Sequence, residues 1–257
     1  MNGRIFLFIG LFFPFFLSSN AQDIKMSATA GLEQVYGNTI TSENLMPFNE
    51  INVEFGYVLY EAKIDIESED AVLELENVRD YAAVYVDSIS QGAVTNNERR
   101  ITLNVGPGER TLRVYAENIG RITYGPEILD NSKGLFGRVT VDGEEIVGWK
   151  ITPLKVRDLQ IQDLKFDSKK LNTLPGFHKG FFSVSDLKDT YLNMAGWGMG
   201  EVWINGQYIG SYWEKEKLQS VQVVADILKK EKNEIVIFEL QNNSQKTVGL
   251  ADQPIFN

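Results

Sequence analysis

The chain has 257 residues, a formal net charge of −10 and no cysteine. Without cysteine, disulfides, thiolate metal sites and a cysteine nucleophile are excluded. The negative charge is dispersed, and Lys and Arg form no long block, so the surface repels phosphate backbones and nucleic acid is not an expected partner.

The N-terminus has the pattern of a secretory signal. Arg4 precedes an apolar run over residues 5–17, and small residues follow at 18–21. The run is shorter than the roughly 20 residues that a membrane-spanning helix needs. We therefore predict a signal peptide over residues 1–21, no membrane span, and a mature protein that is exported to the periplasm or the extracellular space.

The dominant periodicity along the mature chain is two. Apolar residues alternate with more polar ones over residues 58–66, 71–75, 82–86, 101–105 and 112–116. Such alternation places one face of each strand on a core. Turn signals separate the runs, and Asp142-Gly143 and Asn205-Gly206 favour tight hairpins. The pattern predicts an all-β sandwich or barrel with a single short helix over residues 224–230.

A weak internal repeat predicts two related units. Residues 81–87 parallel residues 200–206, and about thirty positions later residues 108–118 parallel residues 232–241. Because the order and the gap agree, we expect two tandem sandwiches. The predicted organisation is an N-terminal extension over 22–42, a first β-sandwich over 43–155, a linker over 156–174 and a second sandwich over 175–257.

Several longer motifs resemble family-35 β-galactosidases. Residues 118–125, 130–134 and 148–154 resemble the first β-domain after the catalytic barrel of that family, and residues 175–182, 189–194, 196–198, 202–206, 210–213 and 233–240 resemble its final jelly roll. The resemblance implies two galactose-binding-like jelly-roll sandwiches. It also implies that the catalytic glutamates lie in a (β/α)₈ barrel of roughly 250 residues. The resemblance begins at about Glu43, only about twenty residues after Gln22, so we expect a non-catalytic chain.

The chain departs from the family pattern at three places. Met199 stands where the family usually has Lys, Ser211 stands where it usually has Arg, and the charged residues 214–217 replace a Gly-Pro-Gln stretch. These changes weaken any transfer of the family's sugar contacts to this chain.

Catalytic and metal chemistry have little support in the residues. The 35 acidic residues are read as solvated surface groups, which is the usual state of Asp and Glu. His178 is the only histidine, so it can build neither a multi-histidine metal site nor, without a Gly-x-Ser-x-Gly elbow, a catalytic triad. We interpret it as structural. A structural calcium ion is left open, because loop oxygens bind calcium without a fixed motif.

Aromatic residues are the stronger ligand-binding candidates, since a pyranose presents an apolar face that stacks on aromatic rings. Trp197, Trp203, Tyr212 and Trp213 lie close together in sequence. A core role is the alternative for each, and it is favoured for Trp203, which lies between Val202 and Ile204. From the family resemblance, the tyrosine that Tyr124 matches can point into the barrel pocket. The predicted ligand-binding residues are Arg121, Tyr124, Trp197, Tyr212 and Trp213, with no catalytic or metal-binding residue.

Three functions remain open from the sequence. The leading hypothesis is an exported, non-catalytic module that binds galactosides or plant-type glycans. The alternatives are an accessory subunit that docks on a separately encoded glycoside hydrolase barrel, and an inactive truncated β-galactosidase. Because the motif around Tyr124 is retained, we expect any interaction to centre on the first sandwich.

Overall fold

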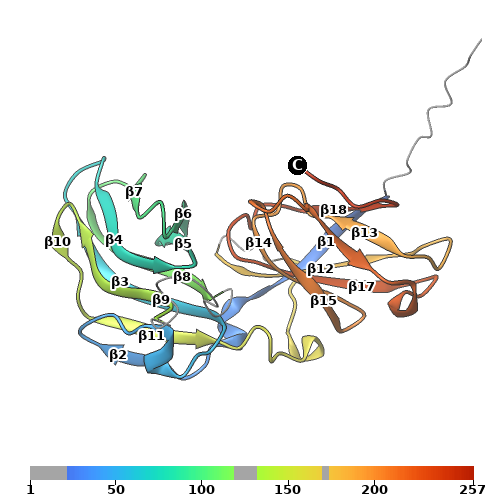
Figure 1. Cartoon of the computed structure of the whole chain (residues 1–257), viewed down its shortest axis with the longest axis horizontal. Helices are drawn as coiled ribbons and strands as arrows, with labels where there is room; N and C mark the ends of the chain where they lie inside the picture. Colours follow the sequence, from blue (N-terminus) through green and yellow to red (C-terminus); the bar gives the residue numbers. More distant parts are fainter. Residues whose placement is uncertain (1–21, 119–131, 170–173) are drawn as a thin grey trace, which may run out of the picture.

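The computed structural model describes residues 22–118, 132–169 and 174–257. These residues form two β-sandwiches beside one another (Figure 1). The predicted all-β class with two tandem sandwiches is confirmed. The predicted helix over residues 224–230 is reduced to a single 3-10 turn, η5 (Ala225–Ile227).

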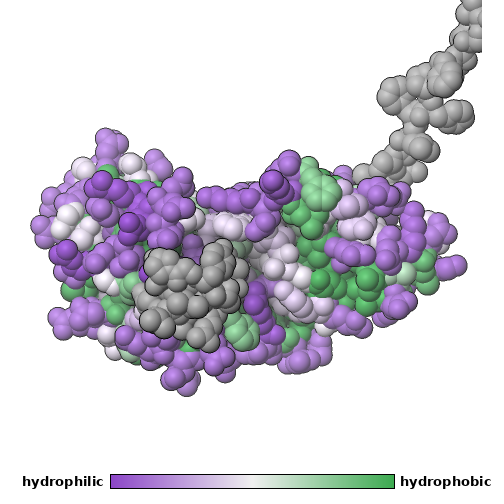
Figure 2. All heavy atoms as spheres, viewed as in Figure 1, coloured by the Kyte–Doolittle hydropathy of each residue, from purple (hydrophilic) through white to green (hydrophobic). Residues whose placement is uncertain are grey.

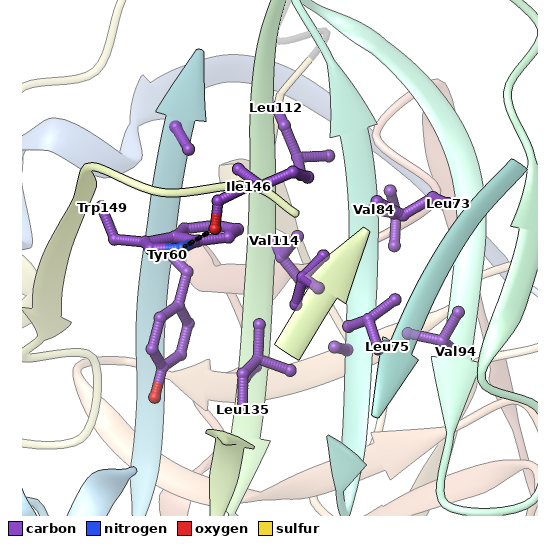
Figure 3. Close-up of a cluster of buried hydrophobic side chains, with 14 of the residues drawn as sticks. Tyr60, Leu73, Leu75, Val84, Val94, Leu112, Val114, Leu135, Ile146 and Trp149 are labelled. Atoms are coloured by element: carbon purple, nitrogen blue, oxygen red, sulfur yellow. Dashed lines mark hydrogen bonds between the residues drawn. The ribbon is translucent and has the colours of Figure 1, made fainter. Parts of the chain in front are cut away.

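The first sandwich packs a six-stranded sheet against a four-stranded sheet. The larger sheet has the order β2 (Ile40–Ser42), β11 (Trp149–Leu154), β3 (Gly56–Ile66), β8 (Gly108–Asn118), β5 (Tyr81–Val86), β6 (Ile89–Thr95). The smaller has the order β10 (Glu144–Glu145), β9 (Gly134–Val141), β4 (Val72–Arg79), β7 (Arg100–Thr102). The alternating apolar residues meet between the sheets. There Trp149 is fully buried and its indole Nε1 donates to the Ile146 carbonyl at 3.0 Å (Figure 3).

The second sandwich is one eight-stranded sheet folded over a core. Its order is β15 (Gln207–Trp213), β14 (Met199–Ile204), β17 (Asn233–Glu239), β12 (Gly176–Phe182), β1 (Gln22–Gly31), β18 (Thr247–Ala251), β13 (Thr190–Asn193), β16 (Ser220–Val223). Apolar side chains from both halves of this sheet share a single core. The predicted hairpin at Asn205-Gly206 joins β14 to β15, and both residues have positive φ angles, 52° and 81°.

Strand β1 joins the two halves of this folded sheet. Its first residues, Gln22 to Lys25, pair with β18, and its later residues, from Met26 to Gly31, pair with β12. Ile24 and Ala30 are buried. Part of the segment predicted as an N-terminal extension is thus a central strand of the second sandwich.

The two sandwiches share a third apolar core where their sheets face each other. In β5, Ala82, Val84 and Val86 point into the first sandwich, whereas Tyr81, Ala83 and Tyr85 pack against the second. The opposite side of this core comes from β12, β14 and β17, including Phe177, Trp203 and Phe238. These strands are therefore buried on both faces, as a continuous apolar run requires. The predicted linker contributes too, through buried Val156, Ile161 and Leu164.

Most of the first sandwich's visible surface is hydrophilic, whereas hydrophobic residues gather on the second sandwich (Figure 2). In the described part of the chain, no helix is both long enough and apolar enough to cross a membrane.

Candidate functional site

A hollow of about 380 Å³ lies where the two sandwiches meet, and we call it the junction hollow. Its wall combines Glu117 at the end of β8, Arg157 from the segment after β11, and residues of β14, β15 and β16. The lining residues are Glu117, Arg157, Met199, Ser211, Tyr212, Trp213, Glu216, Leu218 and Ser220. Hollows of 700 and 450 Å³ on the second sandwich are larger. Neither of those two is lined by a buried ionisable side chain.

A buried ionic network lies beside the junction hollow. Glu201 on β14 is fully buried. Its Oε1 accepts hydrogen bonds from Arg157 Nε at 2.8 Å and from the Tyr57 hydroxyl at 2.9 Å. Its Oε2 accepts one from the Tyr208 hydroxyl at 2.6 Å. Three donors, one of them a guanidinium, thus provide both oxygens of Glu201 with hydrogen-bond partners.

Glu117 is a second buried acid at the same junction, and it has no comparable set of donors. Its Oε1 lies 3.9 Å from Arg157 Nη2, and its Oε2 is buried without a hydrogen-bond partner. Burial, together with the negative charge of Glu201, raises the pKa of Glu117 to about 8. The carboxyl group is therefore mainly protonated at neutral pH.

This shift makes stability depend on pH in a specific window. An acid whose pKa is 4.5 when unfolded and about 8 when folded lowers the free energy of unfolding as pH rises between those values, because only the unfolded state ionises freely. We expect Glu117→Gln to remove this slope, a difference of up to a few kcal/mol at about 1.4 kcal/mol per pKa unit.

Urea unfolding at about pH 5 and about pH 8 checks this expectation. The wild type should lose more stability than Glu117→Gln between the two pH values. Parallel losses in both proteins would contradict the raised pKa. Comparing slopes rather than absolute stabilities cancels the cost of burying the glutamine amide.

A second unpartnered polar atom belongs to Trp213. Its indole Nε1 is buried without an acceptor. Its ring meets Tyr81 of the first sandwich edge-on, with centroids 5.8 Å apart. Buried polar atoms are rarely left unpaired, so an unpaired carboxyl oxygen and an unpaired N–H in two residues that line one hollow indicate a place for a polar molecule.

Two exposed aromatic residues contact members of the ionic network. Phe55 is 54% exposed, and its ring centroid lies 5.7 Å from the Arg157 guanidinium carbon. Tyr208 is 50% exposed and packs its ring against Trp203 while its hydroxyl donates to Glu201. Exposed rings beside a polar hollow suit the binding of ligands with mixed apolar and polar faces.

The predicted aromatic residues are placed differently from one another. Tyr212 and Trp213 both line the junction hollow. The Tyr212 hydroxyl, however, lies 2.9 Å from Glu239 Oε2, and the residue is only 8% exposed. Trp197 is 1% exposed, is not among the lining residues, and donates from Nε1 to the Thr247 carbonyl at 2.9 Å. Arg121 and Tyr124 lie outside the described residues.

His178 is buried on β12. Its Nε2 lies 3.2 Å from the Asn243 side-chain amide, and burial lowers its pKa. Its ring also meets Trp197 edge-on, at 5.4 Å between centroids. Over the described ranges, no group of three or more His, Asp or Glu side chains is arranged to hold a metal ion.

Sequence reasoning missed Phe55, Glu117, Arg157, Glu201 and Tyr208. A signal for the two acids exists, since each adjoins an apolar stretch of its strand, Val114 to Ala116 and Val202 to Ile204. The departures from the family pattern converge on the same place, because Met199, Ser211 and Glu216 all line the junction hollow.

Comparison with known proteins agrees with the two-part architecture. Residues 46–155 match the family described as "Beta-galactosidase, first all-beta domain", and residues 175–233 match "Beta-galactosidase, galactose-binding domain". Beta-galactosidase 17 of Arabidopsis thaliana is 32% identical over 85% of this chain and 37% of its own length. A β-galactosidase of Xanthomonas manihotis is 34% identical over 68% of this chain and 29% of its own length. The chain thus spans about a third of the length of these relatives.

Among solved structures, the apo form of Pleurotus ostreatus lectin aligns with 90% of this chain and 80% of its own. The sequence identity is 11% and the TM-score is 0.29. A TM-score this low carries no functional argument.

Proposed function

Because this chain belongs to the β-galactosidase family through its two non-barrel, all-β domains, we propose that it is an exported, non-catalytic module that binds carbohydrate at the junction hollow. The chain matches the galactose-binding domain, so β-galactosides are the first ligands to test. The export half of the proposal rests on the signal-like pattern over residues 1–21.

The observation that carries the binding proposal is that two residues lining the junction hollow each hold a buried polar atom without a partner. Glu117 Oε2 and Trp213 Nε1 lack partners, and a hydroxyl can both donate and accept a hydrogen bond. A polyhydroxylated ligand offers several such groups at fixed spacing. The exposed ring faces of Phe55 and Tyr208 nearby supply apolar surface for the C–H face of a sugar.

Filling the junction hollow should abolish binding. Ser211 is an exposed residue in its wall, so Ser211→Trp introduces a large side chain without disturbing a core position. We expect this variant to weaken methyl β-D-galactoside binding by at least about tenfold, or about 1.4 kcal/mol, in isothermal titration and on a glycan array.

Ser185→Trp is the matched control, because it makes the same exchange in the wall of the 700 Å³ hollow. It should bind as the wild type does. Undiminished binding by Ser211→Trp, or no glycan bound by the wild type, would contradict the proposal. Binding that survives Ser211→Trp but is lost in Arg121→Ala with Tyr124→Ala would instead locate the site in the first sandwich.

Docking on a separately encoded hydrolase barrel is the second candidate. It is favoured by the half-exposed rings of Phe55 and Tyr208, which a protein surface could cover as readily as a sugar. If the wild type binds no glycan but co-purifies with a barrel protein, and Phe55→Ala with Tyr208→Ala abolishes that association, the docking function replaces the first.

A further inference from the structure

The charges around the junction hollow do not balance. Among the lining residues that the structure describes, Arg157 is the only cationic side chain, and it donates directly to Glu201 at 2.8 Å. Glu117 lies 3.9 Å from the same guanidinium, beyond hydrogen-bond distance. The two buried carboxyl groups of Glu117 and Glu201 thus share the Arg157 guanidinium, which is hydrogen-bonded to Glu201 alone.

Within the described ranges, no cation other than Arg157 forms an ion pair with Glu117. Asp80, which also faces Glu117, is paired with Lys133 at 2.7 Å. On the outer wall, Glu216 adds a further acid. In the part of the chain that the structure describes, the titratable and charged groups around the Glu117 carboxyl or in the wall of the hollow are Tyr57, Asp80, Tyr81, Arg157, Glu201 and Glu216.

From this geometry we propose that the junction hollow selects ligands carrying a protonated primary amine, with the Glu117 carboxylate as the counter-ion of that amine. The inference rests on the proposed binding function and specifies its ligand class as amino-substituted, polyhydroxylated molecules such as amino sugars. An ammonium group has three donors and no acceptor, so it matches a carboxyl group whose Oε2 has no hydrogen-bond partner. A neutral sugar leaves Glu117 protonated, whereas an ammonium group stabilises its ionised form.

The proposal has a signature in protons as well as in affinity. Glu117 has a pKa of about 8 when no ligand is bound. A cation against it favours the ionised form and lowers that pKa. Binding of an amine slightly below pH 8 should therefore release a proton from Glu117, whereas binding of a neutral galactoside should release none.

The test compares methyl 6-amino-6-deoxy-β-D-galactoside with methyl β-D-galactoside, which differ by one amine in place of one hydroxyl. Isothermal titration at about pH 7.5, in buffers of different ionisation enthalpy, gives both affinity and proton release. We expect the wild type to bind the amine about tenfold more tightly and to release more than half a proton per ligand, as the pKa of Glu117 implies.

Two variants separate Glu117 from the general acidity of the surface. In Glu117→Gln the tenfold preference should fall to within about twofold, and proton release should disappear. In Glu231→Gln, where the substituted acid is exposed in the wall of the separate 700 Å³ hollow, both should persist.

The outcomes also separate this inference from the proposed function. If the wild type binds both sugars equally, or if the preference survives in Glu117→Gln, the amine selectivity is wrong while the binding function stands. If the wild type binds neither sugar, both are wrong.

Discussion

A chain that begins at Leu32, and so lacks strand β1, is expected to lose the cooperative fold of its second sandwich. Strand β1 pairs with β18 through its first residues and with β12 through its later ones. Its removal would leave both strands with unpaired edges, and it would take Ile24 from the core of the second sandwich and Ala30 from the core between the sandwiches. Near-ultraviolet circular dichroism should show the loss, because the buried indole of Trp197 lies in this core.

Complementation in trans provides the control. A synthetic peptide of residues 22–31 should restore the signal by strand addition, and a scrambled peptide of the same composition should not. Trp149 reports independently on the first sandwich, since it is buried in the other core. A shortened chain with a wild-type spectrum and wild-type urea midpoint would show that β1 is dispensable.

The role of β1 illustrates which features of the fold were predictable. Alternation over residues 58–66 or 112–116 identifies a strand locally, and the structure confirms both as parts of β3 and β8. The pairing of residues 22–31 with strands almost 150 and more than 200 positions later is a non-local choice. Local periodicity contains no information about such a partner.

The burial of β5 on both faces could not be predicted from its sequence, for a related reason. Its alternation correctly assigned Ala82, Val84 and Val86 to a core. The intervening Tyr81 and Tyr85 read as an outward face, yet they are buried because a second sandwich covers that face. The burial of these two tyrosines depends on the packing of one sandwich on the other, which the sequence of a single strand does not indicate.

The candidate site shows the limit of reading residue types by their usual exposure. Most acids are solvated, and on that ground Glu117, Glu201 and Glu239 received no role, although all three are at most 3% exposed. The aromatic residues drew attention instead, and only Tyr212 and Trp213 of the described candidates line the hollow. An acid adjoining an apolar strand run is the better signal, because its burial requires partners that only the tertiary fold supplies.

Glu239 is the acid whose removal should be most damaging. It is fully buried at the end of β17. Its Oε1 accepts from the backbone N–H groups of Gln241 at 2.7 Å and Asn242 at 2.8 Å, and its Oε2 accepts from that of Gly198 at 2.9 Å and lies 2.9 Å from the Tyr212 hydroxyl. One carboxylate thus ties the chain after β17 to the start of β14 and to β15.

We expect Glu239→Ala to lower the free energy of unfolding by about 3 to 5 kcal/mol, because several buried donors lose their acceptor at once. Urea denaturation followed by tryptophan fluorescence measures the change. Glu234→Ala is the matched control on the same strand, since Glu234 is partly exposed and forms a single ion pair with Lys179 at 3.0 Å. That exchange should cost no more than about 1 kcal/mol. Similar losses in the two variants would mean that the carboxylate of Glu239 is replaceable by water, and that the wall of the junction hollow beside Tyr212 does not depend on it.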